Sequence, residues 1–192
     1  MARPMAGRGG FVHAFEPQPE AARRAAATFA LNGVTNIRLY PCALGDIDGD
    51  VSLFYAAGQS ATASCHLTSH LRRHRRLTSI VVPCRTVDAM VRGGEIGPIG
   101  LMKIDVEGHE MNVLCGAQQT LRSAKPEILY ENNPHTLSSA QWNPSSMEAL
   151  LAGYRFEALR PDGATVTLPT QGNRADSLDV CAFPLSVQDP LE

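Results

Sequence analysis

Short apolar runs recur along the chain, and several of them end beside an acidic residue. Residues 11–15, 99–106 and 126–131 are mainly apolar at consecutive positions. A strand that is buried on both faces shows this pattern, whereas a half-buried strand alternates apolar and polar residues. We therefore predict that these runs are strands of a mainly parallel sheet. Shorter runs over residues 36–40, 51–55 and 80–82 predict further strands.

Helical periodicity separates these runs. Pro19 opens a predicted helix that Asn32 and Gly33 close, and residues 110–123 predict one continuous amphipathic helix. Further helices are predicted to begin at Thr86 and, behind an Asn143 cap, at Pro144. Residues 154–159, 164–168 and 178–183 predict three closing strands, whereas residues 56–79 are predicted to be irregular, with the basic residues 72–76 solvated.

This alternation predicts an α/β fold, with a mostly parallel sheet and helices on both faces. Residues 1–184 are expected to form a single domain, followed by a tail over 185–192. Apolar residues make up 44% of the 192 positions and charged residues 19%, which is typical of a soluble globular protein.

The formal net charge of −2 gives no electrostatic reason to expect a nucleic-acid or membrane partner. No apolar run approaches the roughly 20 residues of a membrane span, and the first residues lack the apolar stretch of a signal peptide. The five cysteines form no Cys-x-x-Cys pair. We therefore expect reduced thiols in a cytoplasmic protein, without a metal site.

Three acids lie at the predicted carboxyl ends of strands, where ligands bind in sheets of this kind. Glu16 follows the first run, Asp105 follows Lys103-Ile104, and Glu131 ends the next strand. A carboxylate at such a position can accept hydrogen bonds from the hydroxyls of a ribose. Taken singly, each acid is weak evidence, because an exposed acid at a strand end is more often a helix cap or part of a solvated turn.

Ordered motifs are more specific than these spacings. They are Val12-His13-Ala14-Phe15-Glu16-Pro17, Cys42-Ala43-Leu44-Gly45-Asp46, Arg85-Thr86-Val87-Asp88, Lys103-Ile104-Asp105-Val106-Glu107-Gly108-His109-Glu110 and Leu114-Cys115-Gly116-Ala117. In this order, and over roughly residues 9–160, they resemble the FkbM family of methyltransferases.

The resemblance implies a Rossmann-like class I methyltransferase fold, S-adenosylmethionine as the donor, and O-methylation of a sugar or other small-molecule hydroxyl. The site residues that it implies are Glu16 and Pro17 at the cofactor ribose, Cys42 and Ala43 beside the adenine, and Asp105, Glu107 and Glu110 near methyl transfer. Asp105 would orient the acceptor or the methionine moiety of the cofactor. His135 or His109 would be the base, because histidine titrates near neutral pH, although each also fits a surface or packing role.

Members of this family begin with a first strand and a loop resembling Asp-x-Gly-Ala-x-x-Gly, and nothing in the printed sequence matches them. Because that strand lies between the second and fourth strands, its loss would leave two inner edges unpaired, at about 1–3 kcal/mol for each lost buried hydrogen bond. Three explanations would account for the missing strand and loop. The sequence starts at a wrong downstream Met, it is a fragment, or the second and fourth strands have closed the gap between them. We expect S-adenosylmethionine to bind weakly or not at all.

Two other functions fit parts of the sequence. A catalytically silent α/β binding or interaction domain would not need the glycine loop. A nicotinamide dehydrogenase also places an acid after its second strand, but no Gly-x-Gly-x-x-Gly precedes Glu16. The acceptor is not identified by the sequence, and the segment 56–79 is expected to help select it.

Overall fold

The computed structural model describes residues 10–56, 59–73, 76–132, 144–160, 163–167 and 178–185. In chain order the elements are β1 (Val12–Phe15), α2 (Pro19–Leu31), β2 (Ile37–Tyr40), β3 (Ala43–Leu44), β4 (Gly49–Ala56), β5 (Gln59–Ser64), α3 (Ser69–Arg72), β6 (Leu77–Arg85), α4 (Val87–Arg92), β7 (Leu101–Ile104), α5 (Glu110–Cys115), α6 (Gln118–Ser123), β8 (Glu127–Asn132), α8 (Pro144–Leu150), β9 (Tyr154–Leu159), β10 (Thr165–Thr167) and β11 (Leu178–Pro184). Helices and strands are mixed along the chain, so the fold is α/β.

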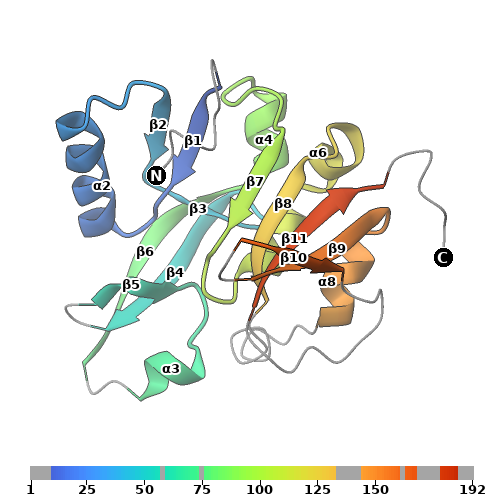
Figure 1. Cartoon of the computed structure of the whole chain (residues 1–192). Coiled ribbons are helices and arrows are strands. Elements are labelled where there is room, and N and C mark those ends of the chain that lie inside the picture. The colour runs from blue at the N-terminus through green and yellow to red at the C-terminus, as the bar shows by residue number, and fades with distance from the viewer. Residues whose placement is uncertain are drawn as a thin grey trace.

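Within the described residues, the strands form three sheets. A five-stranded sheet has the order β10-β9-β11-β8-β7, a four-stranded sheet has the order β3-β6-β4-β5, and β1 pairs with β2 alone. Figure 1 shows β1, β2 and α2 together on one side of the five-stranded sheet, with the four-stranded sheet and α3 below them. The chain therefore builds three small sheets where a single sheet is predicted.

The main core lies between one face of the five-stranded sheet and helices α4, α5, α6 and α8. Its buried side chains include Val87, Met90, Met102, Ile104, Met111, Leu114, Ile128, Tyr130, Met147, Leu151, Phe156 and Val180. The four-stranded sheet has a smaller core of its own, made by Ala43, Leu53, Val82 and Cys84. Burial of these apolar side chains is the main contribution that stabilises the two units.

The prediction of a mostly parallel sheet is wrong for the described residues. Only β1 with β2, β3 with β6 and β7 with β8 pair in parallel, whereas five other strand pairs are antiparallel. Among the described residues, β7 has one buried face and one exposed face. Met102 and Ile104 of β7 are buried, whereas Leu101 and Lys103, which alternate with them, are exposed. The strand thus alternates, as a strand with one open face does.

Two further predictions about local structure are wrong. The segment predicted to be irregular contains β5, α3 and the start of a long β6, because β4 and β6 form an antiparallel ladder from Gly49 to Leu77. The helix predicted over residues 110–123 is two helices, α5 and α6, which Gly116 separates. The carbonyl oxygen of Gly45 approaches Gly116 so closely that a Cβ there would lie 1.9 Å from it.

The two strand edges that the sequence analysis expects to be unpaired carry no ladder within the described residues. There, β1 forms strand hydrogen bonds only with β2, and β7 only with β8. At the start of the predicted tail, the backbone N–H of Leu185 donates to the carbonyl of Gly153 at 2.8 Å, and residues 186–192 lie outside the described residues. All five cysteines are free thiols. Among the described helices, none has the length and apolar character needed to cross a membrane.

Candidate functional site

A tight turn follows β7 and is closed by a buried carboxylate. Glu107 adopts a left-handed backbone conformation (φ 53°), and Gly108 follows with φ 98°. A left-handed residue other than glycine costs about 1–2 kcal/mol, so the surrounding contacts must hold it. Glu110 begins α5 and is 1% exposed; its Oε1 accepts hydrogen bonds from the backbone N–H groups of Val106 and Gly108, both at 3.2 Å. This carboxylate locks the turn.

The Glu107 carboxyl lies half-buried among other acids. Burial, followed by the charges of Glu131, Asp105 and Glu110, raises the pKa of Glu107 to about 7. Glu131 belongs to β8, which pairs in parallel with β7, so the two strands bring these acids to the same end of the sheet. A carboxyl group with a pKa near neutrality can both take and release a proton at physiological pH.

Asp105 and Glu110 differ from Glu107 in their surroundings. The Nζ of Lys103 donates to Oδ2 of Asp105 at 2.6 Å, and both side chains are about half exposed, at 45% and 53%. An exposed ion pair of this kind contributes about 0–1 kcal/mol. Burial raises the pKa of Glu110, although hydrogen bonds from backbone N–H groups partly offset this effect. Glu107 thus has a near-neutral pKa, and its carboxylate does not hold the turn in place as that of Glu110 does.

Glu16 lies at the end of β1 and helps to start α2. Its Oε1 accepts a hydrogen bond from the backbone N–H of Gln18 at 2.8 Å, and the Gln18 side chain in turn caps α2 at Ala21. Burial raises the pKa of Glu16, and the hydrogen bond from Gln18 lowers it. Pro17 next to it is partly buried. One carboxylate oxygen of Glu16 therefore has a structural role at the start of the helix.

Cys42 and Ala43 are both buried, so their side chains face protein. Cys42 packs in the main core, where burial raises the pKa of its thiol, and Ala43 packs in the smaller core while β3 pairs with β6 at Cys84. A ligand beside this segment would therefore meet mainly its backbone groups.

The structure brings Asp105, Glu107, Glu110 and Glu131 together, but it does not bring Glu16 to them. The backbone N–H of Glu16 donates to the carbonyl of Tyr40, and the Tyr40 hydroxyl donates to the carbonyl of Glu95, in the segment that leads into β7. This hydrogen bond joins the Tyr40 side chain to the segment between α4 and β7. Within the described part of the chain, Glu16 forms no hydrogen bond or ion pair with the acids of the turn.

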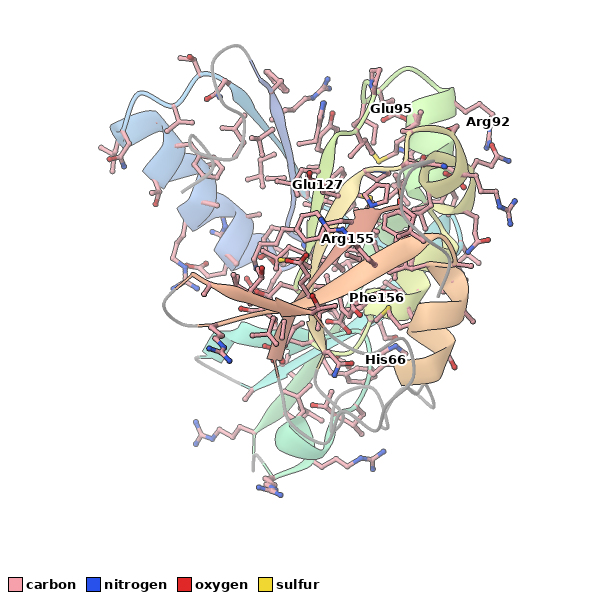
Figure 2. All side chains as sticks on the ribbon, turned by 45° about the vertical axis from the view of Figure 1, so that its right-hand side comes forward. His66, Arg92, Glu95, Glu127, Arg155 and Phe156 are labelled. Atoms are coloured by element: carbon pink, nitrogen blue, oxygen red, sulfur yellow. The ribbon has the colours of Figure 1, made fainter. Side chains whose placement is uncertain are left out.

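The two histidines considered as bases have different outcomes. His135 lies outside the described residues. His109 is 6% exposed, and its Nδ1 lies 2.9 Å from Nε2 of His66. Burial, followed by the charge of His66, lowers the pKa of His109 to about 4, so this ring is neutral at pH 7 and packed inside the protein. In Figure 2, His66 lies in the lower half of the view, whereas Glu95, which precedes β7, and Glu127, which begins β8, lie in the upper half.

Sequence reasoning missed the residues that hold the site from a distance. Ser64 is 1% exposed and its hydroxyl donates to the carbonyl of Glu107 at 2.7 Å. The Asp88 carboxylate accepts hydrogen bonds from the N–H groups of Gln119 and Thr120 and from the Thr120 hydroxyl, at 2.7–2.8 Å. Asp88 belongs to a quoted motif, which was a usable signal. Nothing in the sequence marks Ser64. Across the described residues, no His, Cys, Asp or Glu side chains form a group of three that could hold a metal ion.

Comparison with known proteins assigns the family. A solved structure, that of a methyltransferase FkbM from Methylobacillus flagellatus, matches with 15% sequence identity and a TM-score of 0.48 over 92% of this chain and 38% of that chain. This chain thus spans well under half of that protein's length. Among curated proteins, no match was found. The model of the methyltransferase FkbM domain family matches residues 1–157. Because this match covers far more than half of the sequence, the chain belongs to the FkbM methyltransferase domain family.

Proposed function

We propose that this chain acts as an S-adenosylmethionine-dependent methyltransferase on a hydroxyl of a sugar or other small molecule. The observation that carries the proposal is the acid turn after β7. There, a family motif places Glu107 among three other acids. Burial and the charges of these acids raise the pKa of Glu107 to about 7. A hydroxyl acceptor must lose a proton during methyl transfer, and a carboxylate with a near-neutral pKa suits that step.

The residues present fit the nucleoside half of the cofactor. Glu16 offers a partly buried carboxylate on which, within the described part of the chain, only Oε1 is engaged, by Gln18, so Oε2 suits a ribose hydroxyl. Pro17 and the backbone of Cys42 and Ala43 would lie beside the base. When bound, S-adenosylmethionine supplies an electrophilic methyl group on its sulfonium.

The chain's own residues would then position the acceptor and handle its proton. Glu107 would accept the hydroxyl proton at its carboxylate, and the charges of Glu131 and Asp105 would keep its proton affinity high. Glu110 would hold the turn, and thus the position of Glu107, through its bonds to Val106 and Gly108. Asp105, paired with Lys103 on the open face of β7, would orient the acceptor. Positioning of this kind supplies much of the rate of a displacement reaction.

We also infer that this chain binds the cofactor weakly. The ribose acid Glu16 is joined through Tyr40 to the segment before β7, whereas the acids of the transfer site follow β7. One ligand must reach both. The described strands β1 and β7, which flank this region, share no ladder that would fix their relative position.

Titration of the purified chain with S-adenosylmethionine, by calorimetry and by ligand-observed NMR, tests the proposal. We expect a dissociation constant on the order of 1 mM, about −4 kcal/mol of binding free energy. Glu16→Ala should weaken it about tenfold or more, because a hydrogen bond to a charged group contributes about 1.5–3 kcal/mol. The matched control is Glu20→Ala, an exposed acid in the first turn of α2.

Each outcome has a distinct meaning. Micromolar binding would contradict the inference of weak binding. Binding that does not change in Glu16→Ala, or that weakens equally in Glu20→Ala, would contradict the ribose role of Glu16. No detectable binding at millimolar cofactor would favour a silent interaction domain over an enzyme.

A further inference from the structure

The end of the β4–β5 hairpin contacts the acid turn at two points. The Ser64 hydroxyl donates to the carbonyl oxygen of Glu107 at 2.7 Å, and Nε2 of His66 lies 2.9 Å from Nδ1 of His109. Both contacts join residues that are 43 positions apart in the sequence. Residues 64–66 therefore hold the turn that carries Glu107.

The Ser64 hydroxyl both donates and accepts a hydrogen bond here. It donates to Glu107 and also accepts the backbone N–H of His66 at 3.0 Å, so both of its functions are used. The Ser64 side chain is 1% exposed, so this hydrogen bond is made from a position inside the protein. A buried carbonyl left without its donor costs about 1–3 kcal/mol. That is comparable to the strain of a left-handed glutamate, about 1–2 kcal/mol, which the bond helps to hold.

We propose that Ser64 is a positioning residue that fixes the Glu107 carboxyl among Asp105, Glu110 and Glu131 and links the β4–β5 hairpin to that carboxyl. The three acids face Glu107 from the end of β7, from α5 and from β8, respectively. If the bond is lost, the backbone of Glu107 relaxes towards an ordinary conformation and its side chain turns towards water. This inference rests on the proposed function for the role of Glu107, but the placement of the carboxyl can be measured without cofactor or acceptor.

The test is the proton affinity of Glu107 itself, followed by ¹³C NMR of side-chain carboxyls across pH 3–9 in the full chain. The assignment comes from the signal that disappears in Glu107→Gln. In the wild type, Glu107 should titrate near the pKa of about 7 that its surroundings give it. In Ser64→Ala its proton affinity should fall at least tenfold, towards the ordinary pKa of 4.5. Ser64→Thr, which keeps the hydroxyl, should retain the wild-type value.

Thr68→Ala is the matched control. Thr68 is 3% exposed in the same segment, and its hydroxyl accepts from the backbone N–H of Leu71, not from the turn. Its loss should leave the Glu107 titration unchanged. An unchanged titration in Ser64→Ala, or an equal fall in Thr68→Ala, would overturn the positioning role.

A second measurement covers the case in which Ser64→Ala does not fold. Glycine adopts the left-handed conformation without strain, so the double variant Ser64→Ala/Glu107→Gly should fold and be more stable than Ser64→Ala alone. Failure of both variants to fold would show that Ser64 supports the hairpin and not Glu107. Loss of methyl transfer in Glu107→Gln tests the proposed function separately, so the two can fail independently.

Discussion

Replacing Glu107 with Gln should flatten the pH dependence of stability. The folded protein holds the Glu107 proton at a pKa of about 7, whereas an exposed glutamate in the unfolded chain has 4.5. The unfolded chain therefore releases this proton first as the pH rises. Between about pH 5 and pH 8 the wild type must lose stability, because the folded state is forced to ionise a group that it holds neutral. Glutamine cannot ionise and removes this loss.

The magnitude follows from the two proton affinities. At about 1.4 kcal/mol for each tenfold change, the difference between about 7 and 4.5 corresponds to about 3 kcal/mol at most. Glu107 is only half-buried, and solvent screens part of the repulsion from Asp105 and Glu131, so we expect about 1–2 kcal/mol. Burial also raises the pKa of Glu110, which has the same sign. The variant should therefore keep a smaller residual slope.

Urea denaturation at pH 5.0 and pH 8.0 measures this directly. Glu107→Gln should equal the wild type within about 0.5 kcal/mol at pH 5 and exceed it by about 1–2 kcal/mol at pH 8. Glu127→Gln, an exposed acid at the start of β8, is the control and should follow the wild type at both values. If wild type and Glu107→Gln lose the same stability between pH 5 and pH 8, Glu107 is not a buried acid with a raised pKa.

Two other changes probe the framework of the turn. Gly116→Ala should cost at least about 2 kcal/mol of unfolding free energy, because its Cβ would meet the Gly45 carbonyl at 1.9 Å, whereas Gly100→Ala, with open space around it, should be nearly neutral. Asp88→Ala should cost about 1–2 kcal/mol by removing the acceptor for the first N–H groups of α6, and Asp50→Ala, exposed on β4, should not; thermal denaturation of all four variants decides both cases.

Local patterns predicted the elements well where the information lay within a few residues. Pro19 and the Asn32-Gly33 pair bound α2 as expected, because helix ends depend on nearby capping groups. The runs that predicted β1, β2, β7 and β8 all form strands. The single helix over 110–123 failed for a distant reason. Periodicity continues through Gly116, but the Gly45 backbone occupies the space beside it and the helix is interrupted there.

Sheet organisation was harder, because pairing is a long-range property. Lys103 in the middle of β7 was a local sign of an open face, and it was outweighed by the apolar residues around it. The β4–β6 ladder joins residues up to 35 positions apart, from Gly49 to Cys84, and its alternation is hidden by the serines and threonines of β5 and β6. Exposed small polar residues are common in irregular segments as well as on open sheets, so composition alone could not separate the two.

The candidate site shows the same division between what a motif carries and what the fold supplies. The motif from Lys103 to Glu110 identified the acids, because their spacing is local and the turn needs Gly108. It did not reveal that Glu107 has a left-handed backbone or a near-neutral pKa, since burial and the charge of Glu131 on the next strand raise that pKa and the Ser64 hydroxyl contacts the Glu107 carbonyl from a distant hairpin. A serine that donates one hydrogen bond across 43 residues looks in sequence like any other serine. If Ser64 positions Glu107 as proposed, the chemistry of the motif is set by a hairpin that the motif does not contain.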